Sequence, residues 1–487
     1  MENQGEEEEE FYEEEELIEE EMDPNQEYGE EEEYGEEGNS IIQDVPMPMN
    51  PEDSNLLEIE KNIMTADLSL VNMKIHEILH ILARYHTINP QKSKSEYKTN
   101  LARLYCRFFG YNPELMEYLM KLFNPHECHS FLESMDSPRP MTIRLNTLKT
   151  RKQELLKSLT SRGVNIEELD ESFKVGLKVN ASKVPIGATP EYLAGHYMLQ
   201  SASSWLPVMA LAPKPGDYVL DMAAAPGGKT THIGQILANQ GVIVANDLKK
   251  ERTRALFYNL QRMGITNCIV TNYDGRKMPK SLKNFDRVLL DAPCTGLGVI
   301  SRDPTIKTNR TMRDIYRAGH LQRELLRAAI DHCKVGGTIV YSTCSIAVEE
   351  NEAVVDYAVR SRYVRIEDTG INIDSKIYTK FGENRFNDRI KYCLRVFPHM
   401  HNLDGFFVCK LKKLKDGPKG KEGEAEQEKI NTLKNKNKQE SKMQKKQKAK
   451  KIKNLKYKQK VKGNNKFFLC MLNYRRIIKR KRERDCR

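Results

Sequence analysis

One stretch of the sequence constrains the fold of this chain more than any other. Asp221-Met-Ala-Ala-Ala-Pro-Gly-Gly-Lys-Thr230 joins an apolar run, Tyr218 to Met222, to a glycine-rich turn and then to a helical pattern. In α/β sheets, the backbone N–H groups of such a turn open a helix, and the strand end beside them forms a pocket for a polar or anionic cofactor. The stretch therefore predicts an α/β domain with a cofactor site at this turn.

Two common phosphate-binding motifs resemble the turn, but their spacing differs. A P-loop requires a glycine five positions before its Gly-Lys-Thr, and Ala223 stands where Gly228-Lys229-Thr230 would need that glycine. A dinucleotide fingerprint requires G-x-G-x-x-G, and only the adjacent pair Gly227-Gly228 is present. A third interpretation is the adenosyl pocket of a methyltransferase, in which small residues let the backbone approach a nucleoside.

A second acid favours the adenosyl pocket. The apolar run Val242-Ile-Val-Ala-Asn-Asp247 ends in a carboxylate about 20 residues after the glycines, where it can accept both hydroxyls of a ribose. Asp247 could instead cap the helix that starts near Lys250, and the sequence alone leaves this alternative open.

Charge is segregated between the two ends of the 487-residue chain, whose net charge is +9 and charged fraction 30%. Glu fills the first 36 residues, no Lys or Arg precedes Lys61, and Lys and Arg crowd the sequence after Lys410. We expect a disordered acidic tail over residues 1–60 and a disordered basic tail over residues 414–487. The basic tail suits contact with nucleic-acid phosphates and nuclear import.

Cysteine usage and hydropathy indicate the compartment. The 10 cysteines include no C-x-x-C pair, and the N-terminus lacks a basic and apolar signal peptide, so we expect a reducing compartment. No apolar run approaches the roughly 18 residues that span a bilayer, and we expect no membrane association. In His126-Glu127-Cys128-His129 the possible ligands are too close together and no second half-site follows, so we predict no metal.

Two smaller units precede the cofactor domain. Residues 61–135 form a helical N-terminal module, because Leu68, Val71, Ile75 and further apolar residues recur at three- and four-residue steps; we expect it to pack against the next domain. Residues 136–195 form a small α+β unit, with a strand in 139–146 and a helix over 149–162. Four cations are expected on the polar faces of this unit. They could form an RNA platform, or they could be ordinary exposed charges. They are Arg144, Lys149, Arg151 and Lys152.

Residues 196–413 alternate apolar strands with helices, which predicts a parallel sheet covered on both faces. The segment 405–410 is expected to be a closing edge strand. Such sheets bind ligands at the carboxyl ends of their strands. That rule brings five side chains to one edge: Asp221, Asp247, Asp274, Asp291 and Cys344.

Two cysteines end apolar strands at this edge, in Asp291-Ala-Pro-Cys294 and Ser342-Thr-Cys344-Ser345. A thiolate there is useful when a substrate needs covalent activation. Cytosine is such a substrate, because its C5 becomes nucleophilic only after a thiolate adds to C6. Catalysis then needs an acid near N3 and a base or second thiol for release. Asp291 is close enough to Cys294 for one loop to serve both purposes.

Six motifs together resemble the Nol/Nop/Sun RNA (cytosine-5) methyltransferases, from about residue 124 to residue 413. With the charged ends, they resemble the nucleolar Nop branch, which acts on large-subunit ribosomal RNA. The motifs are Asp221–Thr230, Leu290–Gly298, Tyr341–Ser345, Glu349–Glu352, Pro185–Gln200 and Asp404–Phe407.

The resemblance implies a Rossmann-like class I methyltransferase domain preceded by a small RNA-recognition-like domain. It also implies a nucleolar enzyme of ribosome biogenesis that binds ribosomal RNA or the pre-60S particle. Cys344 would be the nucleophile and Cys294 would assist product release, while Lys229 and Asp291 would orient the cytosine. The residues that would bind S-adenosylmethionine are Ala223, Ala224, Ala225, Pro226, Gly227, Gly228, Lys229, Asp247, Asp274 and Asp291.

Three points stay open at this stage. Family members often carry a cysteine where this chain has Ala223, and we expect little effect on the chemistry. DNA cytosine methyltransferases attack with a Pro-Cys loop, so Cys294 is a rival nucleophile. The charged tails also fit a ribosome-assembly factor that binds pre-ribosomal RNA and for which methylation is dispensable.

Overall fold

The computed structural model describes residues 67–88, 90, 92–169 and 173–419 of the chain. The predicted acidic tail lies outside the described residues, and so does the predicted basic tail from residue 420 onward. Residues 414–418, which we had assigned to that tail, belong instead to the last strand of the large sheet. No helix in the described ranges is long and apolar enough to cross a membrane.

The helical module begins the described chain, as the periodicity predicted. Its helices start at good caps: Ser93 and Glu96 form a capping box, and Asn112 and Asn124 each cap a helix that has proline in its first turn. Its apolar side chains share one core with the segment Ile346–Val348 of the large domain. The helices are α2 (Leu68–Ala83), α3 (Tyr85–Ile88), α4 (Lys94–Phe109), α5 (Pro113–Leu122) and α6 (Pro125–Asp136).

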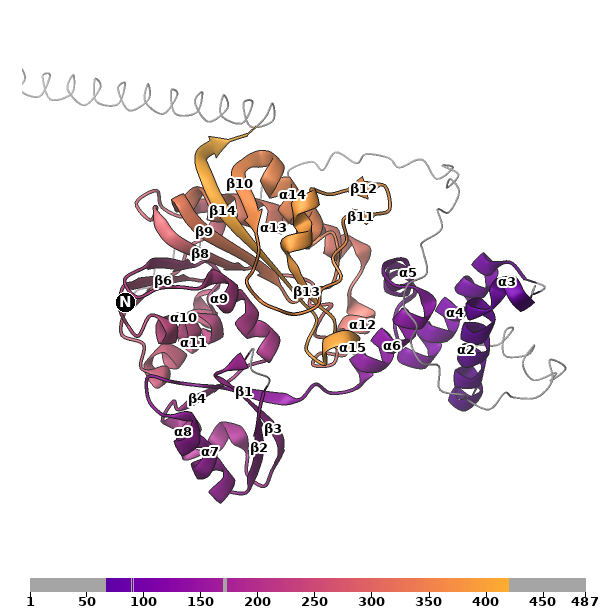
Figure 1. The fold of residues 1–487 in the computed structure, drawn as a ribbon, viewed down its shortest axis with the longest axis horizontal. Coiled ribbons are helices and arrows are strands. Elements are labelled where there is room, and N and C mark those ends of the chain that lie inside the picture. Colours follow the sequence, from indigo (N-terminus) through magenta and orange to yellow (C-terminus); the bar gives the residue numbers. More distant parts are fainter. Residues whose placement is uncertain (1–66, 89, 91, 170–172, 420–487) are drawn as a thin grey trace, which may run out of the picture. The chain divides into compact units, whose positions relative to one another are not determined.

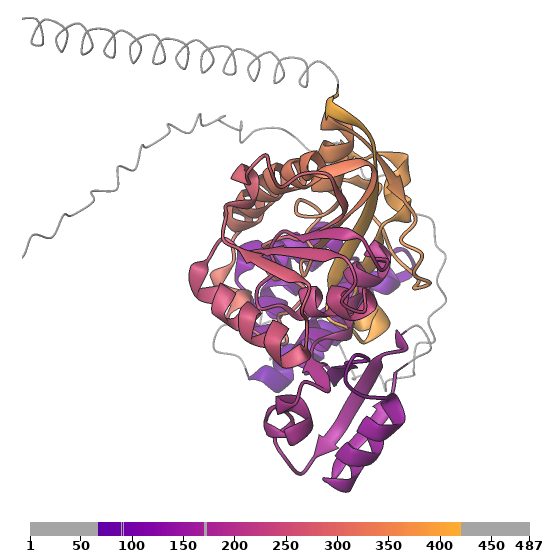
Figure 2. The ribbon, with the colours of Figure 1, turned by 90° about the vertical axis from the view of Figure 1, so that its left-hand side faces the viewer.

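A small domain with a βαββαβ arrangement follows (Figure 1). Its antiparallel strands are ordered β2-β3-β1-β4, and Figure 2 shows them in violet and magenta beside helix α7. The elements are β1 (Met141–Leu145), α7 (Lys152–Ser161), β2 (Val164–Glu168), β3 (Gly176–Ser182), α8 (Pro190–Leu193) and β4 (Tyr197–Leu199).

Within the described residues, the large sheet has eight strands, ordered β10-β14-β9-β8-β5-β6-β7, with β13 paired to β14. Strands β5 to β9 pair in parallel with one another, whereas β14 pairs antiparallel with β9, β10 and β13. The strands are β5 (Tyr218–Asp221), β6 (Val242–Asn246), β7 (Cys268–Thr271), β8 (Phe285–Asp291), β9 (Cys333–Thr343), β10 (Arg362–Glu367), β13 (Leu394–Val396) and β14 (Phe406–Pro418). Strands β11 (Lys380–Phe381) and β12 (Asn384–Arg385) form a separate hairpin.

Helices cover both faces of the large sheet, as predicted (Figure 1). Successive strand residues point to opposite faces, so that Val219 packs with α9, α10 and α11 while Leu220 packs with α13 and α14. The helices of the two faces are α9 (Leu206–Leu211), α10 (Gly228–Ile236), α11 (Lys250–Met263), α13 (Met312–His332) and α14 (Glu352–Ser361); α12 (Ile306–Asn309) and α15 (Pro398–His401) are single turns.

The prediction that residues 405–410 form an edge strand is wrong. Strand β14 lies between β9 and β10 and is hydrogen-bonded on both sides. Phe406 and Phe407 pack on opposite faces of the sheet, which is the pattern of an internal strand. The true edge on this side of the sheet is β10, a segment that was not predicted to be a strand.

Candidate active site

Strands β5, β6, β8 and β9 run parallel, so their carboxyl ends meet at one edge of the sheet. Asp221 ends β5 and Asp291 ends β8, where Asp291 pairs in register with Ser342 of β9. Cys344 directly follows the end of β9. The structure therefore brings the predicted carboxylates and the second cysteine motif to one side of the sheet.

The glycine-rich turn between β5 and α10 is held from outside. Gly227 has φ of 101° at the N-terminus of α10, a conformation that favours glycine. Arg252 of α11 donates to the carbonyl of Ala225 at 2.7 Å, and Asn259 donates to that of Pro226 at 2.9 Å. The three alanines before the proline add only methyl side chains to the turn. The turn is thus a rigid cradle with small side chains.

Asp247 lies against this turn and does not cap α11. Its Oδ2 accepts the N–H of Ala225 at 3.1 Å and its Oδ1 accepts the N–H of Lys249 at 3.0 Å. The residue at the cap position of α11 is Lys249, which makes no side-chain cap bond. The capping alternative from the sequence is therefore not what the structure shows.

Asp221 has an unsatisfied buried oxygen beside the turn. The residue is 0% exposed, its Oδ2 accepts the hydroxyl of Thr230 at 2.7 Å, and its Oδ1 has no hydrogen-bond partner. Burial raises the pKa of Asp221 to about 7. An orphaned acceptor next to a small-residue cradle fits a cofactor that carries an N–H donor, as S-adenosylmethionine does.

Lys229 and Asp291 form an ion pair at the same edge, with 2.7 Å between Lys229 Nζ and Asp291 Oδ2. Ser342 donates its hydroxyl to the other oxygen, Oδ1, at 2.7 Å. The ammonium of Lys229 also lies 5.3 Å from the centre of the Phe406 ring. These contacts fix the orientation of Asp291.

The sulfur atoms of Cys294 and Cys344 lie 3.1 Å apart, although the residues are 50 positions apart in the sequence. The hydrogen bond with Cys344, together with burial, raises the pKa of Cys294 well above that of a free thiol. Cys344 is partly exposed. Two thiols in contact at a ligand-binding edge can divide the roles of nucleophile and proton carrier.

Asp274 lies beyond β7 and has other partners. Its carboxylate pairs with Arg276 at 2.9 Å, which lowers the pKa of Asp274, and Arg276 in turn pairs with Glu324 at 2.8 Å. The preceding residue, Tyr273, is hydrogen-bonded to Asn246 at the end of β6. The loop is therefore tied to the strand end that precedes Asp247.

Comparisons with known proteins identify the family of this chain. A sequence profile described as 16S rRNA methyltransferase RsmB/F matches residues 208–412, and a ferredoxin-like domain of RsmF/B-like methyltransferases matches residues 115–186. The tRNA (cytosine(49)-C(5))-methyltransferase of Pyrococcus abyssi is 34% identical over 303 residues, which are 62% of this chain and 96% of that protein. The chain belongs to the RsmB/F methyltransferase family.

Eukaryotic members of the RsmB/F family match more strongly. The 25S rRNA (cytosine-C(5))-methyltransferase nop2 of Schizosaccharomyces pombe is 48% identical over 384 residues, or 77% of this chain and 63% of that protein. The 28S rRNA (cytosine(4447)-C(5))-methyltransferase of Homo sapiens is 49% identical over 375 residues, or 76% of this chain and 46% of that protein. The chain thus spans about half of the length of these relatives.

Solved structures of the family share the fold. A methyltransferase homologue from Pyrococcus horikoshii superposes with a TM-score of 0.59 at 35% identity and covers 66% of this chain and 100% of its own. NSun6 from Pyrococcus horikoshii with SFG, an S-adenosylmethionine analogue, gives 0.56 at 28% identity, covering 62% and 98%. The comparisons confirm the Nol/Nop/Sun resemblance and the predicted fold class.

The prediction that Arg144 lies on a polar face of the small domain is wrong. Arg144 is 0% exposed and donates to the carbonyl of Gly228 at 2.6 Å and to Thr231 Oγ1 at 2.8 Å. The ammonium group of Lys149 donates hydrogen bonds to the backbone carbonyls of Ala194 and Arg262. Periodicity could not reveal this, because both faces of β1 are covered once the RsmB/F methyltransferase domain docks on it.

The side chains of the segment His126–His129, considered above as possible metal ligands, make separate contacts in this RsmB/F family member. Glu127 pairs with Lys376 at 2.6 Å, whereas His129 stacks on the ring of Tyr105. No group of three or more possible metal ligands converges anywhere in the described ranges. The local cluster instead contributes to packing of the helical module.

Sequence reasoning missed one residue beneath the cysteines. Glu350 lies in a motif that carried the family resemblance, yet no role was assigned to it. The structure shows its carboxylate buried and bonded to both cysteine loops. Burial raises the pKa of Glu350. The position of an acid in a family motif was the available signal, but only the folded chain shows what the acid contacts.

Proposed function

We propose that this protein transfers a methyl group from S-adenosylmethionine to C5 of a cytosine in large-subunit ribosomal RNA. The observation that carries the proposal is the 3.1 Å contact between Cys294 and Cys344 beside the Lys229–Asp291 pair. The names of the fission-yeast and human relatives, both rRNA (cytosine-C(5))-methyltransferases, support the substrate class.

In the proposed reaction, the thiolate of Cys344 forms a bond to C6 of cytosine, which makes C5 nucleophilic. Cys344 loses its own proton to solvent before the attack, and Cys294, whose pKa is raised by its contact with Cys344, remains a thiol during the attack. Asp291, oriented by Lys229 and Ser342, would meet N3 and the exocyclic amine of the base. For release, Cys294 loses its proton to solvent and its thiolate takes the C5 proton, while the electrons of the C5–H bond restore the C5=C6 double bond and the sulfur of Cys344 leaves C6.

The cofactor would supply an electrophilic methyl group to C5. The residues that would hold it are those of the turn from Ala223 to Lys229, with Asp247, Asp274 and Asp291 at the strand ends. The unpartnered Oδ1 of Asp221 supports this assignment, since a buried acceptor normally has a donor. The related NSun6 structure that contains SFG supports the same cofactor class.

Separate substitutions of the two cysteines test the assigned roles. With ribosomal RNA and S-adenosylmethionine, Cys344→Ala should abolish methylation, whereas Cys294→Ala should accumulate a covalent protein–RNA adduct that survives denaturing electrophoresis. Bisulfite sequencing of the RNA with and without the protein locates the modified cytosine. An adduct that accumulates with Cys344→Ala would reverse the roles and make Cys294 the nucleophile.

We further propose that the protein works in the nucleolus on ribosomal RNA or the pre-60S particle, in large-subunit biogenesis. The names of the relatives support this setting. The competing hypothesis, an assembly factor with dispensable methylation, makes a different prediction for cells that carry only Cys344→Ala. Normal large-subunit maturation in these cells would favour the assembly role, and failed maturation with intact RNA binding would favour the enzyme.

A further inference from the structure

Glu350 joins the two cysteine loops through the residue that follows each cysteine. Thr295, next to Cys294, donates its backbone N–H to Glu350 Oε1 at 2.9 Å and its hydroxyl to Oε2. Ser345, next to Cys344, donates its hydroxyl to the same Oε2. One carboxylate therefore holds both loops at points adjacent to the two sulfurs.

The rest of the surroundings of Glu350 is also occupied. Gln322 of α13 donates to Oε1 of Glu350 at 3.0 Å and to the carbonyl of Pro293 at 2.8 Å. It therefore links Glu350 to the Cys294 loop through a further residue. Tyr341 of β9 donates its hydroxyl to the backbone carbonyl of Glu350. With four donors on its carboxylate and 0% exposure, Glu350 is placed to organise the loops rather than to meet solvent or substrate.

A short backbone contact leaves little freedom elsewhere in the two loops. Gly298 donates its N–H to the carbonyl of Cys344 at 2.8 Å, and a Cβ at Gly298 would lie only 2.7 Å from that carbonyl oxygen. The loops are thus held together by this contact as well as by Glu350.

We propose that Glu350 is a positioning residue that sets the distance between Cys294 and Cys344, and thereby controls the step that needs both thiols. The inference rests on the proposed function for its catalytic consequence, but not for its geometric one. Without the carboxylate, Thr295 and Ser345 lose their common acceptor and the two loops separate. Attack by Cys344 needs one thiol, whereas product release needs both, so release is the step that should suffer more.

The geometric claim can be tested without any activity. Dibromobimane bridges two neighbouring thiols by forming two C–S bonds, with release of two bromide ions and two protons, and becomes fluorescent. The bridging rate is measured on the full chain, with Cys294→Ala as the background from all other cysteines. Glu350→Gln should bridge at least about tenfold more slowly than the wild-type protein, because an amide cannot accept all four bonds.

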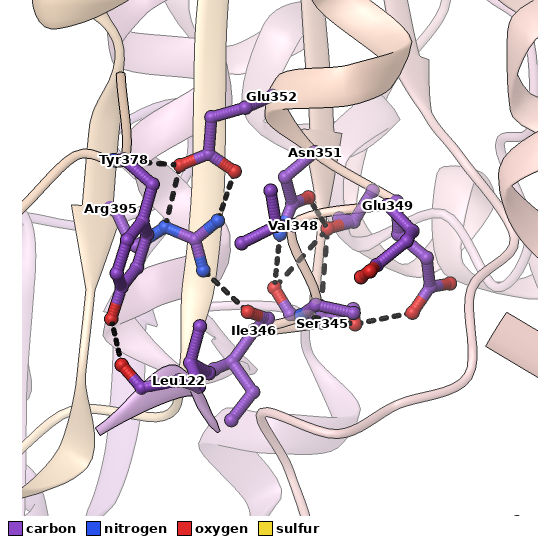
Figure 3. A network of polar contacts seen from close by, with 12 residues as sticks. Leu122, Ser345, Ile346, Val348, Glu349, Asn351, Glu352, Tyr378 and Arg395 are labelled. Atoms are coloured by element: carbon purple, nitrogen blue, oxygen red, sulfur yellow. Dashed lines mark hydrogen bonds and ion pairs between the residues drawn. The ribbon is translucent and has the colours of Figure 1, made fainter. Parts of the chain in front are cut away.

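Glu352→Gln is the matched control. Glu352 is as buried as Glu350 and lies in the same segment, but it pairs with Arg395, which donates to the carbonyl of Ile346 (Figure 3). This variant should bridge within about twofold of the wild-type rate. If Glu350→Gln does not fold, as judged by circular dichroism, the single-donor variants Thr295→Val and Ser345→Ala carry the same prediction with smaller effects. Wild-type bridging in a folded Glu350→Gln protein, or in both single-donor variants, overturns the proposal.

The catalytic consequence is measured by steady-state turnover on RNA. Glu350→Gln should lower kcat about tenfold with KM for RNA unchanged, and should raise the steady-state fraction of covalent adduct as Cys294→Ala does. Loss of turnover without adduct, in protein that bridges slowly, would overturn the control of release. Absence of methylation by the wild-type protein would refute the proposed function instead, and the bridging rates would still decide the positioning role.

Discussion

Lys229 Nζ lies 2.7 Å from Asp291 Oδ2, although the two residues are 62 positions apart in the sequence. Lys229 belongs to the first turn of α10, directly after the cofactor turn, and Asp291 ends β8, directly before the Cys294 loop. One ion pair thus connects the part of the molecule that would hold the cofactor with the part that would hold the base.

Replacing Lys229 by methionine should lower the rate of methyl transfer about 10²-fold. The substitution leaves Asp291 without its cation and free to reorient, and positioned proton-transfer groups typically contribute at least that much. Single-turnover kinetics with saturating cofactor measure the effect. Lys152→Met is the control, since it breaks the exposed 2.9 Å pair with Glu168 in the small domain and should change the rate less than about twofold. An unchanged rate in Lys229→Met would contradict the assigned role.

Arg144→Met should uncouple the small domain from the cofactor helix. The change removes the donors to Gly228 and Thr231 at the start of α10, and the loss of these charge-assisted bonds should cost about 2–4 kcal/mol. Urea denaturation measures the stability, and calorimetric titration should show weaker binding of S-adenosylmethionine. Lys178→Met, which breaks an exposed pair with Glu167 in the same sheet, should change neither. Wild-type affinity in a destabilised Arg144→Met protein would limit the residue to a structural role.

Tyr118→Phe should loosen the helical module from the methyltransferase domain. The hydroxyl of Tyr118 donates to Glu349 Oε2 at 2.6 Å and accepts the N–H of Val348 at 2.9 Å, just beyond the Cys344 loop. Its loss should lower the free energy of unfolding by about 1–3 kcal/mol, because it leaves a buried N–H without a partner. Tyr105→Phe is the matched control within the module, where the hydroxyl bonds only to the carbonyl of Pro125, and it should cost less. Equal losses in the two variants would refute the docking role.

Asp221 should make the ligand-free protein less stable as pH rises. Its pKa in the fold is about 7, above the ordinary 3.8, so the folded protein keeps a proton that the unfolded chain releases. The stability from this group is full below about pH 4 and is lost as pH rises toward 7, by on the order of 4 kcal/mol. Thermal unfolding of Asp221→Asn between pH 4 and 8 should therefore lack this downward slope. A slope equal to that of the wild-type protein would contradict the prediction.

Local sequence patterns predicted most strands and helices of the large domain, but they failed where a position depends on a partner strand or a partner domain. The alternation of apolar strands with helices predicted strands β5 to β9 and their two covered faces, because each element buries its own periodic side chains. The placement of β14 was wrong because an internal position depends on β10, a strand that was not predicted and whose pairing with β14 is set only by the folded chain. Arg144 was assigned to a polar face for a similar reason, since its partners lie on another domain.

The sequence by itself determined the class of chemistry: its glycine-rich turn, the acids at strand ends and two cysteines in loop motifs all lie within short segments whose meaning is local. Only the tertiary structure decided which of these groups touch. The contact of Cys294 with Cys344, the pairing of Lys229 with Asp291 and the two loops held by Glu350 join residues from separate strands. Their distances arise from strand register and buried hydrogen bonds, which depend on the whole chain having folded.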